Sequence, residues 1–290
     1  MFHYLQSYAD IDFIVRRLIP SERDRLPWHE RSGGPVTIDT GESQLSPVLC
    51  LHSLFLDPRS FEGLVAAGAG RFRFIAPEFP GQAGRLDEAD ATVTMDRCTD
   101  DVLALVDRLG LASVSAVGQS MGGDVAVRIA ARRPGLVDRL VLMGSSAGAE
   151  TPENRELFGA FVDRFEREGF TPEVVDFVKG ILFAATVLDD PGRTDIHETW
   201  TRRLGELSPR LAHAARGVVE RESALDLLPR ITARTLIISG TQDHARPPAW
   251  SDEMFDAIPD AELWRIKTAG HSPCLEDPGA VLPRVLDFLA

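Results

Sequence analysis

Ser120 is the first candidate for chemistry in this sequence, because it lies at the centre of residues 118–122, GQSMG. An apolar run ends just before this motif, and an amphipathic helical pattern begins just after it. A serine that turns the chain sharply from strand to helix needs residues without bulk two positions to either side, and Gly118 and Gly122 meet that need. The helix that follows then directs its free amides toward the serine, where an oxyanion would form during acyl transfer. The motif therefore predicts a nucleophilic serine.

A serine hydroxyl at its ordinary pKa is a weak nucleophile, so it needs a base within hydrogen-bond reach and a third group that orients the base. Asp243 directly follows one apolar strand pattern, and His271 follows another. Because α/β sheets gather functional groups at the carboxyl ends of their strands, we expect both side chains at the same edge as Ser120. Glu150, which follows a further strand, is the reserve acid. The order Ser, Asp, His predicts a catalytic triad.

Elements that would position these side chains alternate along the chain. Short β-rich runs and amphipathic helical patterns follow one another from residue 35 to 148, and the alternation resumes near residue 235. The expected strands are 36–38, 48–51, 72–75, 114–117, 140–143, 235–238 and 263–266. This pattern predicts an α/β fold with a mostly parallel sheet flanked by helices.

Helical patterns without a convincing strand fill the range between these two parts. We therefore expect an α/β core of residues 35–150 and 232–290, an inserted helical cap over 151–231, and an N-terminal extension over 1–34. Six cap phenylalanines are expected to form mostly the cap's own core, with one or two facing a substrate: Phe158, Phe161, Phe165, Phe170, Phe177 and Phe183.

Composition excludes several classes of function. The formal net charge of −13 over 290 residues disfavours nucleic acid and anionic membrane surfaces as partners. No stretch approaches the roughly 20 apolar residues that span a bilayer, and the first 20 residues make a poor signal peptide. The three cysteines are widely spaced and predict neither a disulfide framework nor a zinc site, and the histidines form no metal-binding set. We expect a cytoplasmic protein.

These motifs together resemble those of the α/β-hydrolase family, from about residue 35 to the end of the chain with the cap interposed, and the resemblance implies a mostly parallel sheet of the eight-stranded type. The resemblance is carried by GQSMGG at 118–123, GTQD at 240–243 and GH at 270–271, and also by PEFPG at 77–81 and LEDP at 275–278. It implies that Ser120 is the nucleophile, Asp243 the acid and His271 the base. It further implies an oxyanion hole formed by the amides of Leu54 and Met121, each worth roughly 3 kcal/mol of barrier lowering, and no cofactor or metal.

The turn that carries Leu54 departs from the pattern of many family members. Those members have His-Gly where this chain has His52-Ser53, and the run resembles the Asn-Ser-Leu-Gly of 3-oxoadipate enol-lactonases only at Ser53 and Leu54. The lack of a glycine-rich His-Gly-x-Gly stretch disfavours a carbon–carbon bond hydrolase. Serine rather than aspartate at position 120 disfavours epoxide hydrolases and haloalkane dehalogenases.

We therefore expect a serine hydrolase that cleaves a carboxylic ester or lactone of a mainly apolar small molecule through an acyl-enzyme. One alternative is a cofactor-free perhydrolase or haloperoxidase, because those enzymes share a Ser-Met-Gly-Gly run. Another is a ligand-binding protein of the same fold with little turnover, since fold does not fix function. His52 is expected to shape its loop, while Cys50 and Cys274 are expected to pack in the core.

Overall fold

A single mainly parallel sheet organises the computed structural model, which describes residues 37–290. Within that range the sheet has seven strands in the order β1-β3-β2-β4-β5-β6-β7, and only the pairing of β1 with β3 is antiparallel. The strands are β1 (Thr37–Asp39), β2 (Ser46–Leu51), β3 (Phe72–Pro77), β4 (Val114–Gln119), β5 (Val137–Met143), β6 (Arg234–Gly240) and β7 (Ala261–Ile266). The predicted fold class, a mostly parallel sheet flanked by helices, is confirmed, with seven strands among residues 37–290 where the eight-stranded type was expected.

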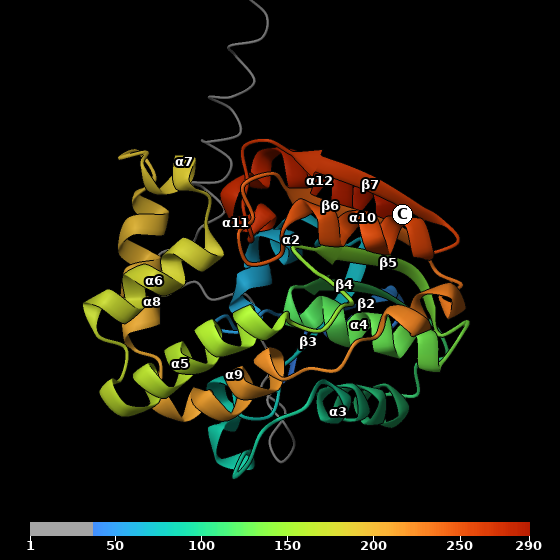
Figure 1. The fold of residues 1–290 in the computed structure, drawn as a ribbon. Helices are drawn as coiled ribbons and strands as arrows, with labels where there is room; N and C mark the ends of the chain where they lie inside the picture. Colours follow the sequence, from blue (N-terminus) through green and yellow to red (C-terminus); the bar gives the residue numbers. More distant parts are fainter. Residues whose placement is uncertain (1–36) are drawn as a thin grey trace, which may run out of the picture.

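Helices cover both faces of the sheet (Figure 1). Because side chains alternate along a strand, Leu49 and Leu51 of β2 pack on one face, and Val48 and Cys50 pack on the other. The first face is covered by α3 (Met95–Arg108), α4 (Met121–Arg132) and α10 (Pro248–Ala257). The second is covered by α2 (Glu62–Ala67), α11 (Pro273–Glu276) and α12 (Pro278–Leu289). Two apolar layers therefore hold the strands in place.

Helices also fill the chain between β5 and β6, and they gather on one side of the molecule, at the left of Figure 1. They are α5 (Pro152–Glu168), α6 (Pro172–Leu182), α7 (Ala185–Leu188), α8 (Thr201–Gly205) and α9 (Ala212–Val219). The hydroxyls of Thr151 and Thr171 cap α5 and α6, and a proline follows each cap where a missing amide hydrogen costs nothing. We refer to residues 151–231 as the helical segment.

Two of the expectations from the sequence concern the N-terminal extension and membrane-spanning segments. The expected N-terminal extension, residues 1–34, lies outside the described residues. Among residues 37–290, none of the helices is both long enough and apolar enough to cross a bilayer.

Candidate active site

Ser120 lies at the turn between β4 and α4 with φ 51° and ψ −114°, a left-handed backbone conformation that non-glycine residues rarely adopt. The neighbouring glycines make this turn possible. A Cβ on Gly122 would overlap the carbonyl oxygen of Leu51, and one on Gly118 would come within 2.6 Å of the Gly122 carbonyl oxygen. Gly123 is also required, because its Cβ would overlap the Ser145 side chain. The close approach of α4 to β2 and β4 thus holds the strained serine.

Asp243 and His271 meet as the sequence predicted. His271 Nδ1 lies 2.9 Å from Asp243 Oδ2, and both residues are 3% exposed. The other carboxylate oxygen, Oδ1, accepts hydrogen bonds from the amides of Ala245 and Arg246 at 2.9 and 2.8 Å. Both oxygens of Asp243 are therefore engaged, which orients the carboxylate toward the imidazole. Ser120 and His271 line one pocket.

Glu150, the reserve acid, has different partners. Its Oε1 accepts hydrogen bonds from Arg221 Nη1 and Arg246 Nη1, each at 2.7 Å, and its Oε2 accepts one from Asn154 at 3.0 Å. Burial by itself would raise the pKa of Glu150, but Arg246, Arg221 and Asn154 together hold it below its ordinary value. Asp243 is thus the carboxylate that contacts His271.

The loop after β2 carries the first predicted oxyanion donor, Leu54. His52 is the first residue of this loop; its Nδ1 donates to the Ser53 carbonyl at 2.9 Å and its Nε2 accepts from the Phe79 amide at 3.4 Å. Burial lowers the pKa of His52, which favours this neutral form. The next residue, Phe55, has φ 65°. His52 therefore links the backbone of its own loop, through Nδ1, to the backbone of the loop after β3, through Nε2.

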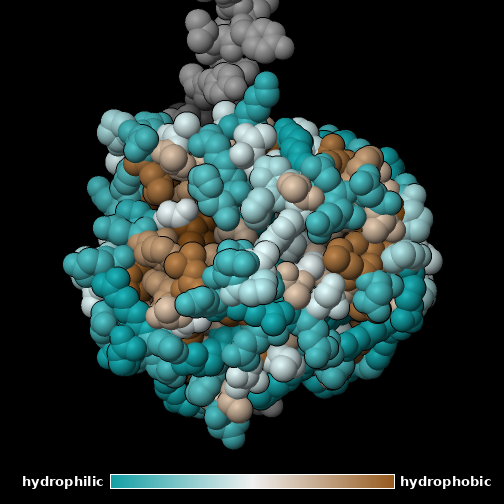
Figure 2. All heavy atoms as spheres, viewed as in Figure 1, coloured by the Kyte–Doolittle hydropathy of each residue, from teal (hydrophilic) through white to brown (hydrophobic). Residues whose placement is uncertain are grey.

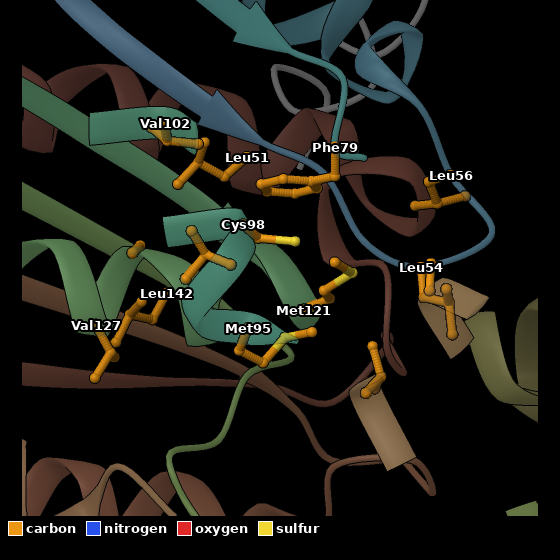
Figure 3. Packing of buried hydrophobic residues seen from close by; sticks show 14 of the residues in the cluster. Leu51, Leu54, Leu56, Phe79, Met95, Cys98, Val102, Met121, Val127 and Leu142 are labelled. Carbon is orange, nitrogen blue, oxygen red and sulfur yellow. The ribbon is translucent and has the colours of Figure 1, made fainter. Parts of the chain in front are cut away.

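Met121, the second predicted donor, is the first residue of α4. Its side chain points into the apolar cluster that includes Met95, Cys98 and Phe79 (Figure 3), and Gln82 Nε2 contacts its sulfur at 3.2 Å. Among the hydrogen bonds described for residues 37–290, none is donated by the amides of Met121 or Leu54. Both amides remain available to a ligand atom.

Glu276 supports the loop that carries His271, a role that the sequence did not reveal. Its carboxylate accepts hydrogen bonds from three backbone amides, those of Ala184 at 2.6 Å, Gly270 at 3.0 Å and Ser272 at 2.8 Å. Burial raises its pKa, although these amides oppose the shift. The position lies in the LEDP run, yet nothing local distinguishes an acid that binds distant amides from an exposed one. Glu276 thereby ties the His271 loop to the helical segment.

The pocket beside Ser120 is mostly apolar. Two of the six predicted cap phenylalanines, Phe158 and Phe161, line it, together with side chains from α6 and α9. Its polar lining consists of Ser53, Ser120, Glu150, Arg246 and His271. Arg246 was missed in the sequence, where the only signal is its place three residues beyond Asp243. The pocket can therefore hold an apolar ligand with a few polar contacts.

The three cysteines lie apart from this chemistry. Cys50, Cys98 and Cys274 are free and buried. Burial raises the pKa of both Cys98 and Cys274 to about 12, which keeps them protonated at neutral pH. In the part of the chain that the structure describes, histidine, cysteine and acidic side chains form no group of three that could hold a metal ion.

Comparison with known proteins shows the family to which the chain belongs. The model of the alpha/beta hydrolase fold matches residues 46–278, so the chain belongs to the α/β-hydrolase fold family. It is a hydrolase. A 2-hydroxymuconate semialdehyde hydrolase from Pseudomonas sp. strain CF600 is 29% identical, over 75% of this chain and 76% of the relative.

Solved structures of two hydrolases are similar over most of their length. A thermophilic esterase from Thermogutta terrifontis has a TM-score of 0.78 and 27% identity, covering 90% of this chain and 96% of its own. An enol-lactonase from Burkholderia xenovorans LB400 has a TM-score of 0.77 and 26% identity, covering 87% of this chain and 95% of its own.

Proposed function

We propose that this hydrolase cleaves a carboxylic ester or lactone of a mainly apolar small molecule through an acyl-enzyme. One observation carries the proposal: the strained Ser120 lines one largely apolar pocket together with His271, whose Nδ1 lies 2.9 Å from Asp243 Oδ2. The similar esterase and enol-lactonase structures support it. We also propose that residues 151–231 form a cap that closes the pocket, and that residues 35–150 and 232–290 form the core that carries the catalytic residues.

Each group has a definite role in the proposed reaction. Ser120 Oγ attacks the carbonyl carbon while His271 Nε2 takes the hydroxyl proton and then returns it to the leaving alcohol. Asp243 accepts a hydrogen bond from Nδ1–H of His271 and remains a carboxylate, which sets the tautomer and stabilises the imidazolium. The amides of Leu54 and Met121 bind the oxyanion. Water activated by His271 then hydrolyses the acyl-enzyme and restores Ser120.

Substitution of the nucleophile tests this proposal directly. If the three side chains act as a unit, Ser120→Ala lowers kcat by about a millionfold, because the attacking hydroxyl is removed. The measurement is hydrolysis of 4-nitrophenyl esters and lactones of varied chain length by both proteins. Ester hydrolysis retained by Ser120→Ala would refute the assignment, and the preferred chain length measures the pocket.

Covalent labelling separates an enzyme from a binding protein of the same fold. A fluorophosphonate should label Ser120 stoichiometrically and abolish ester hydrolysis, while Ser120→Ala remains unlabelled. A reactive serine without measurable turnover on any ester or lactone would instead support the ligand-binding role.

A further inference from the structure

Arg246 is a buried pocket residue whose guanidinium uses only one of its three nitrogens in hydrogen bonds to the described part of the protein. It is 6% exposed and lines the same pocket as Ser120 and His271. Among residues 37–290, the hydrogen bonds of its guanidinium are donated by Nη1 alone, to Glu150 Oε1 at 2.7 Å and to the Ala245 carbonyl at 2.9 Å. Nε and Nη2 have no protein acceptor in that range. Neither nitrogen is among the fully buried side-chain atoms without a partner, so each keeps some exposed surface at which a ligand oxygen can replace water.

Glu150 does not provide Arg246 with a carboxylate of its own. The oxygen that Arg246 contacts also accepts a hydrogen bond from Arg221 at 2.7 Å, so two guanidinium groups share one oxygen atom. The second oxygen of Glu150 is occupied by Asn154. The two-pronged pairing that a guanidinium forms with a planar carboxylate is therefore absent here.

Contacts with neighbouring groups hold Arg246 in position. Its Cζ lies 5.5 Å from the centre of the Trp250 ring, and its own amide binds Asp243. Arg221, which also contacts Glu150, has Asp124 at 3.2 Å from its Nε. Arg246 is thus held by neighbours while two of its nitrogens remain open to the pocket.

We propose that Arg246 is the anion-binding residue of this pocket and that the substrate is an ester or lactone bearing a carboxylate. This inference rests on the proposed function for the bond that is cleaved. Nε and Nη2 would donate to the two carboxylate oxygens of the substrate, while the apolar lining contacts its hydrocarbon part. Arg246 then determines specificity and takes no part in proton transfer.

Two matched ester pairs test the proposal. In the first, the charge is on the acyl part: mono-4-nitrophenyl glutarate against 4-nitrophenyl methyl glutarate. In the second, it is on the alcohol part: the butyrate ester of 4-hydroxybenzoate against that of methyl 4-hydroxybenzoate. For at least one pair we expect kcat/KM to favour the anionic ester, and Arg246→Gln to reduce that preference by about 10- to 100-fold.

Two further variants show whether the fork of Arg246 carries the effect. Arg246→Lys keeps the charge but loses the planar donor pair, so we expect an intermediate preference for the anionic ester. This second variant also serves as a control in case the glutamine variant misfolds. Arg108→Gln, the same change at an exposed position of α3, should keep the wild-type ratio. Equal loss of activity on the charged and neutral esters of both pairs, or no anionic preference in the wild type, would overturn the proposal.

A binding measurement distinguishes failure of this inference from failure of the proposed function. If the wild type hydrolyses none of the four esters, the proposed function fails, and calorimetry with monomethyl glutarate decides about Arg246. Binding that weakens at least about tenfold in Arg246→Gln supports the anion site. Equal affinity of both proteins for monomethyl glutarate would overturn it.

Discussion

At the scale of single residues, the site separates two carboxylates that the sequence alone left as alternatives. Asp243 contacts His271, and the backbone amides of residues 245 and 246 hold its other oxygen. Glu150 is engaged by Arg221 and Arg246. The difference lies in the partners, because both acids are buried and both follow strands. Only Asp243 is placed to orient the imidazole.

Replacing Asp243 should therefore have a large effect on catalysis. Asn at this position presents either an oxygen or an NH₂ group to Nδ1, and in the second arrangement the proton moves to Nε2, where it prevents His271 from accepting the serine proton. We expect Asp243→Asn to lower kcat by roughly 10⁴-fold, measured on the best 4-nitrophenyl ester. Asp256→Asn, on the exposed face of α10, is the matched control. A loss below tenfold would contradict the role of Asp243.

At the scale of elements, close backbone approaches set the position of the helical segment as well as that of α4. In α9, a Cβ on Gly217 would overlap the carbonyl oxygen of Val93, in the loop that leads into α3. The Val93 amide also donates to the His213 carbonyl at 3.0 Å. Since α9 contributes Ala215, Val218 and Val219 to the pocket lining, this contact fixes one wall of the pocket against the core.

A matched pair of glycine substitutions tests this packing. Gly217→Ala should lower the free energy of unfolding by about 1–3 kcal/mol, because the added methyl group forces α9 away from residue 93. Gly159→Ala is the control: its Cβ would meet nothing within 4 Å inside α5, so a gain of up to about 1 kcal/mol is expected from helix propensity. Urea unfolding measures both. Equal stability of the two variants would show that α9 has room to move.

At the scale of the whole molecule, some large apolar side chains are exposed to water while some titratable side chains are partly withdrawn from it. Apolar surface is visible on the side where the helical segment lies (Figure 2), and Leu157 of α5 and Phe177 of α6 are among the exposed large apolar side chains. Glu78 is a half-buried acid in the loop that follows β3. Burial raises the pKa of Glu78, after β3, to about 7, against the opposing hydrogen bond from the Gly84 amide.

This shift makes part of the stability depend on pH. Because the folded pKa lies above the ordinary value of 4.5, the folded protein retains the proton while the unfolded chain loses it, so stability falls as pH rises from about 4.5 to 7. Glu78→Gln removes this dependence. Relative to the wild type, the variant should gain about 1 kcal/mol between pH 5 and 8, after allowing for the partial exposure of Glu78. Thermal unfolding at several pH values measures it; a difference independent of pH would refute the shift.

The alternation of strands and helices was readable from the sequence, because each buried strand is a short apolar run and each helix repeats its apolar residues at helical spacing. The tight turn at Ser120 could also be predicted from a local pattern, since such a turn requires glycines at fixed positions. Asp243 and His271 followed from a rule of topology that brings the ends of parallel strands to one edge.

Tertiary structure alone decided which groups meet across long sequence separations. Glu276 binds the amide of Ala184, and Arg246 shares Glu150 with Arg221. A charged residue in a loop carries no local mark of its partner, because burial and pairing are fixed only when segments far apart in the chain pack together. The candidate residues Ser120, Asp243 and His271 were therefore predictable from local motifs, whereas the pocket and the sharing of Glu150 by two arginines arise from packing.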